Sequence, residues 1–567
     1  MKNNSLWIVL QRMRMPFLVI VSTYFISMIG MVMIPGLDSN GKEYHMSIFD
    51  AFYFITYTAT TIGFGEIPYA FTYGQRMWVS FSIYFNVLGW FYGIGSLVAL
   101  VQDKLFIEEI AKNKFLKQRK NLKEKYILVL GYNLITSEII KKALESGIRA
   151  VVIEKDQAKV QELLLENFTP LVPVLNADVY SPLALEMAGI HSIYCKAVVS
   201  LFQDDTLNTR IALTVKLLNP KVKLAVKATT YGNVETLQDI GVEIIENPFD
   251  IIASQTNKAL NQPHLLRLER WIYGSSELTA PLMRFPTGKY VMCGFGRMGE
   301  VIYKVLKENA LEIKCIEHDS AKLKNLTEDE KNDIFFVENY DKKALLDIGI
   351  EEAKYIVIGT KNDTTNLTIA LKAKKLNPNI ITIVRENEME DFSIFQTDKI
   401  DHILMPSRIL IDKTINAIIR PSADVFVKNL NTISDNDAQN IIKMLLDIDK
   451  NPILFELKIT EDESFELYRR LDNKAIITLD LLRKSLTEKD HLNNVFIFLI
   501  LRKSGEIMLP SWEEKLQKDD IVLIGCDEHA KEEMELITNN FHEFEFAYVG
   551  REYTALQNLF TRTTQTT

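Results

Sequence analysis

Cysteine is scarce in this chain of 567 residues, and its scarcity excludes two kinds of scaffold. The four cysteines lie far apart, and no two of them form a CxxC pair: Cys195, Cys293, Cys315 and Cys526. The sequence therefore indicates neither a disulfide framework nor a cysteine-ligated zinc site. We expect all four side chains to be small hydrophobic residues of a core.

A strong excess of one charge is also absent. The chain carries 65 Lys and Arg residues against 74 Asp and Glu residues, which gives a net charge of −9. Without a large basic face, nucleic-acid binding is not expected.

Two long runs without charged residues lie in the first fifth of the chain. The first lies between Pro16 and Pro35, and the second extends from Met77 to about Val101. As helices, both are long enough to span the ~30 Å hydrocarbon layer of a membrane. A secretory signal peptide is the competing interpretation of the first run, but its length and the second run after it argue against this. The sequence therefore predicts transmembrane helices at about 15–35 and 76–103.

Basic residues flank these runs on one side only. Lys2, Arg12 and Arg14 precede the first run and eight basic residues lie within 104–125, whereas the segment between the runs carries more acidic than basic residues. The positive-inside rule then predicts an integral membrane protein with both termini in the cytoplasm. We expect the bacterial inner (plasma) membrane as its location.

A short Thr- and Gly-rich segment between the runs reads TATTIGFGE at 58–66. Glycines alternating with bulkier residues let a backbone run with its carbonyls pointing one way, which L-residues alone do poorly. Four such strands around an axis would form rings of carbonyl oxygens that replace the water around a K⁺ ion. The segment resembles the Thr-Val-Gly-Tyr-Gly selectivity filter of potassium channels. This resemblance implies a homotetramer and a filter made of Thr60, Thr61, Ile62, Gly63, Phe64 and Gly65.

Phe64 stands where that filter commonly has Tyr, and Glu66 where it commonly has Asp. Phe64 lacks a hydroxyl that could tie the filter to its surroundings. The aromatic segment before the filter is expected to form a pore helix at 47–59, with Ser47 as its N-cap and Asp50 as the capping partner.

Three glycines interrupt the second apolar run: Gly89, Gly93 and Gly95. Glycines in a transmembrane helix permit either close packing or bending. Because the inner helix of two-span channels bends to open the pore, all three are candidates for a gate or hinge, and close packing is the alternative for each.

Beyond a charged linker (106–125), expected to be helical, the chain repeats itself. YILVLGYNLIT from Tyr126 aligns with KYVMCGFGRMG from Lys289, and DDTLNTRIALTVKLLNP from Asp204 aligns with NDTTNLTIALKAKKLNP from Asn362. Both copies alternate short β-branched runs with amphipathic stretches, which predicts parallel sheets flanked by helices. The predicted fold class is multidomain: an all-α two-span transmembrane pore module, two α/β Rossmann-like domains and a small α+β C-terminal lobe.

The second copy contains GxGxxG between a predicted strand and a predicted helix, with Glu317 roughly twenty residues further on. Such glycines allow a tight turn and the approach of a pyrophosphate to the helix N-terminus, and the acid would accept hydrogen bonds from ribose hydroxyls, which disfavours NADP. The residues expected to bind a nucleotide are Gly294, Phe295, Gly296, Arg297, Met298, Gly299, Glu317, His318 and Glu338.

The first copy keeps only the first glycine of this turn. Asn133 could adopt a positive φ, which Asn tolerates better than most residues, whereas Thr136 would hold the helix further from the strand. A weaker site, suited to a ligand such as a mononucleotide, is expected at Gly131, Tyr132, Asn133, Glu154 and Asp178.

The whole arrangement resembles two-transmembrane potassium channels with tandem RCK (regulator of potassium conductance) domains, of the prokaryotic ligand-gated type. The resemblance implies a pore module at 1–105, a linker at 106–125, RCK domains at 126–284 and 285–420, a C-terminal lobe at 421–550 and a polar, disordered tail at 551–567.

The resemblance also implies the function: a potassium-selective channel gated by a cytoplasmic adenine nucleotide such as NAD or ADP, surrounded by membrane lipid and without enzyme activity. Ca²⁺ is a second candidate ligand, because the acidic clusters at 461–463 and 351–352 offer carboxylates, although solvated surface acids are the alternative and no metal site is identified. The alternative function is a membrane-anchored dinucleotide-dependent oxidoreductase, for which His318 is the best available acid–base group.

Overall fold

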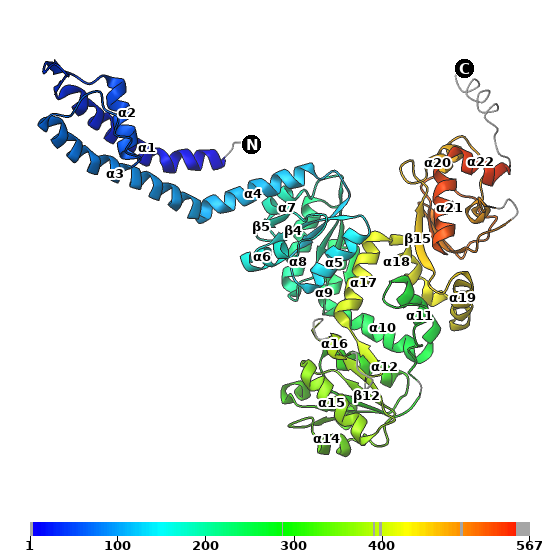
Figure 1. Ribbon diagram of the computed structural model, residues 1–567. Coiled ribbons are helices and arrows are strands. Elements are labelled where there is room, and N and C mark those ends of the chain that lie inside the picture. Colours follow the sequence, from blue (N-terminus) through cyan, green and yellow to red (C-terminus); the bar gives the residue numbers. More distant parts are fainter. Residues whose placement is uncertain (1–3, 286, 389–391, 396–399, 488–490, 551–567) are drawn as a thin grey trace. The chain divides into compact units, whose positions relative to one another are not determined.

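The computed structural model describes residues 4–285, 287–388, 392–395, 400–487 and 491–550 (Figure 1). The predicted polar tail at 551–567 lies outside these residues. The chain divides into two compact units, Met1–Leu122 and Lys123–Thr567.

The first unit is helical. Its helices are α1 (Asn4–Met33), α2 (Ile48–Ala59), α3 (Tyr73–Gln102) and α4 (Lys104–Asn121), and a short hairpin, β1 (Gly36–Leu37) and β2 (Glu43–Tyr44), follows α1. By length and composition, two segments could cross a membrane: Val9–Met33 and Tyr73–Gln102. They coincide with the two apolar runs, and α4 gives the linker its expected helical conformation.

Helices α1 and α3 pack closely through small and polar residues. The amide of Asn86 donates a buried hydrogen bond of 2.7 Å to the hydroxyl of Ser27 across the helix pair. At the end of α3, Asp103 caps α4 by accepting from Phe106 N, and its other oxygen lies 2.9 Å from Arg12 of α1. Small residues and interhelical hydrogen bonds are the usual means of helix association in lipid.

The second unit contains two parallel six-stranded sheets with the same topology. The first has the order β5-β4-β3-β6-β7-β8, and the second has the order β11-β10-β9-β12-β13-β14. The first sheet consists of β3 (Tyr126–Leu130), β4 (Arg149–Glu154), β5 (Val174–Asn176), β6 (Cys195–Ser200), β7 (Lys223–Lys227) and β8 (Ile244–Glu246). The second consists of β9 (Tyr290–Cys293), β10 (Ile313–Glu317), β11 (Ile334–Phe336), β12 (Tyr355–Ile358), β13 (Ile381–Arg385) and β14 (His402–Leu404).

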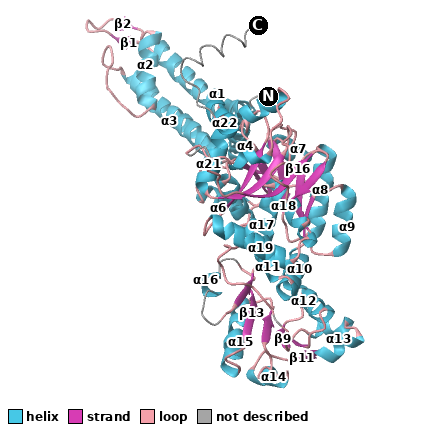
Figure 2. Ribbon diagram, turned by 90° about the vertical axis from the view of Figure 1, so that its right-hand side faces the viewer, coloured by secondary structure: helices cyan, strands magenta, loops and turns pink. Residues whose placement is uncertain are grey.

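Helices cover both faces of each sheet (Figure 2). In the first domain these are α5 (Leu134–Glu145), α6 (Gln157–Leu165), α7 (Pro182–Ala188), α8 (Asp205–Leu218) and α9 (Tyr231–Ile240). In the second they are α12 (Arg297–Glu308), α13 (Glu328–Asp333), α14 (Lys342–Asp347) and α15 (Asp363–Leu376), and the short α16 (Phe392–Phe395) follows β13. Successive side chains along a strand point to opposite faces of the sheet. Met292 packs against the α12 side, whereas Val291 and Cys293 pack against α14 and α15.

The helices after each sheet are exchanged between the two domains (Figure 1). After β8 come α10 (Pro248–Asn261) and α11 (Pro263–Ile272), and after β14 come α17 (Pro406–Ile419) and α18 (Pro421–Lys428). From α10, Phe249 and Ile252 belong to the core of the second domain, whereas Leu410 and Ile415 of α17 belong to the core of the first. Each Rossmann-like core is therefore completed by a helix from the other copy.

An antiparallel sheet forms the centre of the C-terminal lobe, with the order β15-β18-β16-β17. It consists of β15 (Ile453–Lys458), β16 (Phe496–Arg502), β17 (Gly505–Met508) and β18 (Ile521–Cys526), together with α19 (Asp435–Ile448), α20 (Phe465–Asp472), α21 (Glu528–Asn539) and α22 (Phe541–Val549). The predicted fold class, with a helical two-span module, two parallel-sheet domains and a C-terminal lobe, is confirmed.

Candidate functional site

The Thr- and Gly-rich segment after α2 has an unusual backbone. Three alternate residues have positive φ: Thr61 at 63°, Gly63 at 63° and Gly65 at 75°. When residues with positive and negative φ alternate, successive carbonyls point to one side of the strand, as an ion-coordinating filter requires. A β-branched residue such as Thr61 rarely adopts a positive φ, and strain of this kind is concentrated at functional sites.

Helix α2 holds both ends of this segment. The helix begins after Ser47, whose hydroxyl accepts a hydrogen bond from Asp50 N and so acts as the expected N-cap. At the N-terminal end of the segment, Ile62 N and Gly63 N both donate to the carbonyl of Tyr57, at 3.0 and 3.1 Å.

The C-terminal end of the segment is held by two tyrosine hydroxyls. Tyr57 donates to the carbonyl of Glu66 and Tyr53 donates to its carboxylate, each at 2.8 Å. The ring of Phe64 meets that of Tyr57 edge-on, with ring centroids 6.2 Å apart. Helix α2 therefore supplies the hydroxyl contacts that Phe64 itself lacks.

The three glycines of α3 differ in their surroundings. A Cβ on Gly89 would lie 2.9 Å from the hydroxyl of Thr23, and one on Gly93 would lie 2.5 Å from Cδ1 of Ile20, both on α1. A Cβ on Gly95 would have no described atom within 4 Å. Close packing accounts for Gly89 and Gly93, and Gly95 is the hinge candidate that packing does not explain.

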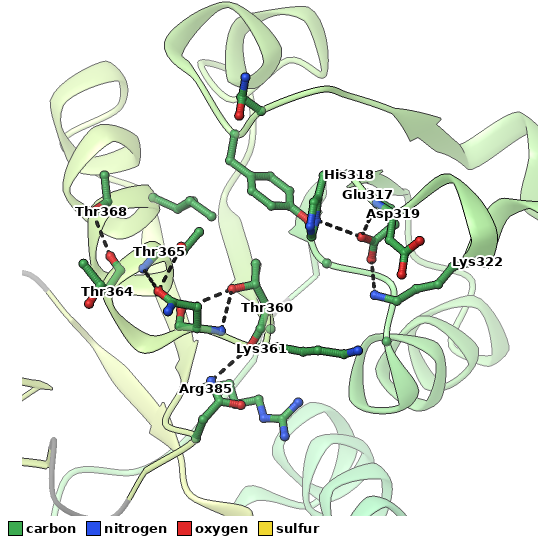
Figure 3. Close-up of a pocket in the computed structure, with 18 of the residues that line it drawn as sticks. Glu317, His318, Asp319, Lys322, Thr360, Lys361, Thr364, Thr365, Thr368 and Arg385 are labelled. Carbon is green, nitrogen blue, oxygen red and sulfur yellow. Dashed lines mark hydrogen bonds and ion pairs between the residues drawn. The ribbon is translucent and has the colours of Figure 1, made fainter.

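A cavity of about 820 Å³ lies at the carboxyl ends of the second domain's strands. Figure 3 shows one wall with Glu317, His318, Asp319 and Lys322, and another with the segment that carries Thr360, Lys361 and Thr364, next to Arg385. In open parallel sheets, ligands bind outside the carboxyl ends of the strands. Of the predicted nucleotide-binding residues, six line this cavity: Gly294, Gly296, Arg297, Glu317, His318 and Glu338.

The three glycines of the GxGxxG turn have different roles. Gly294 has φ 99°, and a Cβ there would lie 3.0 Å from the carbonyl carbon of Gly359. A Cβ on Gly299 would lie 2.3 Å from the carbonyl oxygen of Gly294, so both glycines are required by close packing of the backbone. Gly296 is the N-cap of α12 and provides no side-chain cap, and the nearest atom to a Cβ there would be Lys322 Nζ at 3.8 Å. This position leaves the helix N-terminus open to an anion.

Glu317 is completely buried and both of its oxygens are engaged. One oxygen accepts from Phe295 N at 2.6 Å and from Lys322 Nζ at 2.8 Å, and the other accepts from Asp319 N at 2.9 Å. Burial alone would raise the pKa of this carboxyl, but Lys322 and the two backbone N–H groups lower the pKa below its ordinary value. Glu317 therefore fixes the glycine turn to the end of β10, and its contact with a ribose stays a prediction.

Three predicted residues do not line the cavity: Gly299, whose role is packing of the turn, Met298 and Phe295. Met298 is buried in the core beneath α12, and Phe295 contributes its backbone N–H to Glu317. His318, by contrast, is part of the cavity wall, where its Nδ1 lies 3.2 Å from the hydroxyl of Tyr340.

The corresponding turn of the first domain is filled by its own side chains. A Cβ on Gly131, which has φ 83°, would lie 2.4 Å from the ring of Phe202. Asn133 does not adopt the positive φ that it could tolerate: its φ is −160°, and its side chain caps α5 by accepting from Thr136 N. Glu154 repeats the role of Glu317 by accepting from Tyr132 N at 2.6 Å. The predicted ligand site of this copy stays a prediction, as does the part of Asp178, which pairs with Lys155 at 2.9 Å.

The acidic clusters proposed for Ca²⁺ have lysine partners. Glu463 pairs with Lys125 and Lys458, and Glu352 pairs with Lys289 at 3.0 Å. Within the described ranges, no group of three or more His, Cys, Asp or Glu residues is arranged to hold a metal ion. Calcium binding stays a prediction.

Two family models match the chain at the features described above. The ion channel model matches residues 16–103, and the TrkA-N domain model matches both 127–248 and 290–406. The chain is thus a membrane protein that joins a two-span ion-channel module to two TrkA-N domains. This confirms the predicted resemblance to two-span potassium channels with tandem RCK domains.

Individual relatives match over short regions. "Potassium channel protein 1" of Methanocaldococcus jannaschii is 34% identical over 97 residues, which are 17% of this chain and 29% of that protein. An "Uncharacterized protein" of Methanothermus fervidus is 33% identical over 21% of this chain and 19% of its own length. A "Trk system potassium uptake protein TrkA homolog" of Pyrococcus horikoshii is 28% identical over 19% of this chain and 48% of its own length. The chain thus spans less than half the length of each.

Solved structures align with most of the chain at low sequence identity. The "GsuK Channel" structure covers 97% of this chain and 100% of its own with 14% identity and a TM-score of 0.49. A second, "GsuK channel bound to NAD", covers 94% of this chain and 99% of its own with 12% identity and a TM-score of 0.47.

Proposed function

We propose that the chain forms a potassium-selective channel that opens and closes in response to a cytoplasmic adenine nucleotide. The observation that carries this proposal is the alternation of positive φ at Thr61, Gly63 and Gly65, in a segment between two helices long enough to span a membrane. Four chains would supply the filter, because carbonyl rings around a dehydrated K⁺ need four strands. The exposed side chains of Ile62 and Phe64 would then be covered by neighbouring subunits.

The nucleotide, such as NAD or ADP, would occupy the cavity of the second domain. Gly296 would receive its phosphates at the N-terminus of α12, where backbone N–H groups and the helix dipole favour an anion. A ligand changes the pore only through its different affinities for the open and closed states. The coupling would pass through α4 to α3, with Gly95 as the hinge.

This channel would lie in the bacterial inner membrane, with both termini in the cytoplasm and with lipid around α1 and α3. An oxidoreductase is not part of this proposal, because that alternative does not explain the two-span ion-channel module at residues 16–103.

Recording from the purified full-length protein in lipid bilayers tests this function. We expect K⁺-selective currents whose open probability changes when ADP or NAD is added on the side that faces the TrkA-N domains. The variant Gly63→Ala serves as the control for the filter, because it places a Cβ at a positive φ and should abolish the current. No K⁺-selective conductance under any condition would refute the proposal.

A further inference from the structure

Cationic groups from both Rossmann-like domains converge on one end of the second domain's cavity. Arg297 and Arg385 of the second domain line the cavity, and so does Gln203, which lies on the loop after β6 of the first domain. Directly behind Gln203 lies Lys227, whose side chain is only 5% exposed. Lys227 Nζ donates a hydrogen bond of 2.6 Å to Oε1 of Gln203.

This hydrogen bond fixes the direction of the Gln203 amide. A lysine ammonium has only donors, so the amide must present its oxygen to Lys227 and its NH₂ group away from it. Gln203 is exposed, and no described residue accepts from its Nε2. The amide therefore offers two N–H donors beside the positive charge of a buried lysine.

Neither Lys227 nor Arg385 forms an ion pair with a described residue, although Asp205 and Asp363 are close enough to act on their charges. Burial and the neighbouring Arg297 lower the pKa of Lys227 to about 8, with Asp205 acting in the opposite direction. Burial and, to a smaller extent, the neighbouring Arg297 lower the pKa of Arg385, and Asp363 acts in the opposite direction. The Nε of Arg385 has no hydrogen-bond partner among the described residues. Buried charges are normally paired, whereas here Lys227 and Arg385 both lie near the like charge of Arg297 and neither forms an ion pair with a described carboxylate.

We propose that Gln203 and Lys227 of the first domain complete the phosphate-binding end of the second domain's cavity, which makes a nucleoside diphosphate a bridge between the two domains. This inference rests on the proposed function, since it concerns the same cavity. Its first phosphate would lie at the N-terminus of α12 beside Gly296, and the terminal phosphate would accept from the Gln203 amide and neutralise the cations. The first domain, whose own turn is filled by Phe202 and Asn133, would thus contribute to ligand binding at its neighbour's site.

The substitution Gln203→Glu tests this inference with almost no change of shape. The new carboxylate would pair with Lys227 and repel a phosphate. The matched control is Gln238→Glu, which makes the same charge change at an exposed position on α9. Binding of ADP and of adenosine to the full-length protein in detergent is measured by calorimetry, and thermal unfolding without ligand shows that each variant is folded.

We expect Gln203→Glu to weaken ADP binding by at least tenfold, because charge-assisted hydrogen bonds are the strong ones, and to leave adenosine binding unchanged. Gln238→Glu should bind ADP as the wild type does. Equal ADP affinities of the two variants would overturn the bridging role and leave the nucleotide site intact. If the wild type binds neither ADP nor adenosine, the nucleotide part of the proposed function fails instead.

Discussion

Gly296 is the position where a single substitution separates ligand binding from folding. Its φ of −87° is ordinary, and a Cβ would meet only Lys322 Nζ at 3.8 Å, so a side chain fits there without strain. Asp in place of Gly296 would also be a good N-cap for α12, where the two residues differ by only a few tenths of a kcal/mol. The Gly296→Asp protein should therefore be as stable as the wild type.

The same carboxylate would occupy the place proposed for a phosphate. Two unit charges about 5 Å apart in a medium with an effective dielectric constant of about 20 repel each other by about 3 kcal/mol. This energy corresponds to an affinity roughly a hundredfold weaker. At an ADP concentration about 100 times the wild-type Kd, stabilisation by the ligand would then fall from about 2.7 to about 0.4 kcal/mol.

Thermal unfolding of the full-length protein in detergent, with and without ADP, measures both effects. Gly232→Asp is the matched control, because it places the same charge in the first turn of α9, where a Cβ would meet no described atom. Gly299→Ala is the contrasting variant: its Cβ would lie 2.3 Å from a carbonyl oxygen, and it should lose stability by about 1–3 kcal/mol without ligand. A Gly296→Asp protein that keeps the full ADP response would refute the assignment of α12 as the phosphate site.

Three further predictions concern the filter, the helix pair and the pH dependence. Tyr57→Phe removes the hydrogen bond to the carbonyl of Glu66, worth about 1 kcal/mol, and single-channel records should show shorter openings with unchanged selectivity. Gly93→Ala should lower the melting temperature through its contact with α1, whereas Gly95→Ala should leave it unchanged and shift the open probability. Because burial and Arg297 lower the pKa of Lys227 to about 8, ADP affinity should fall as the pH rises through that value from about pH 7, where the phosphates of ADP are already ionised. Lys227→Arg, which stays charged, should flatten the profile over this range.

Each of these has a clear contrary outcome. Single-channel openings of Tyr57→Phe that last as long as those of the wild type would mean that the filter does not need the hydroxyl contact. Equal melting temperatures of Gly93→Ala and Gly95→Ala would contradict the packing role of the former. A pH profile that is the same with lysine and arginine at position 227 would exclude this lysine as the titrating group.

Most of the architecture could be predicted because it depends on local pattern. Strands of β-branched residues and the repeat predicted ten of the twelve parallel strands. Strands β8 and β14 were not predicted, and their short length alone does not explain this, since β5 and β11 are equally short and were predicted. The exchange of α10 and α17 could not be predicted, since an amphipathic helix shows which of its faces is buried but not against which core.

The candidate site was harder to predict because spacing does not determine direction. Glu317 stands where a ribose acceptor is expected, yet its carboxylate turns inward to Phe295 N and Lys322. Gln203 and Arg385 were missed, although the repeat offers a signal for one of them: it aligns Arg385 with Lys227, at the ends of equivalent strands. Gln203 could not be predicted, because its position at the second domain's cavity depends on how the exchanged helices hold the two domains together.

The exchange of α10 and α17 also changes how the two domains associate. Separate copies that traded these helices would form a dimer whose population depends on protein concentration, whereas a continuous chain makes the same association intramolecular, at an effective concentration in the millimolar range or above. The pair therefore cannot come apart on dilution. A ligand that changes the angle between the domains therefore does not have to bring them together, and the change depends only on its different affinities for the two angles.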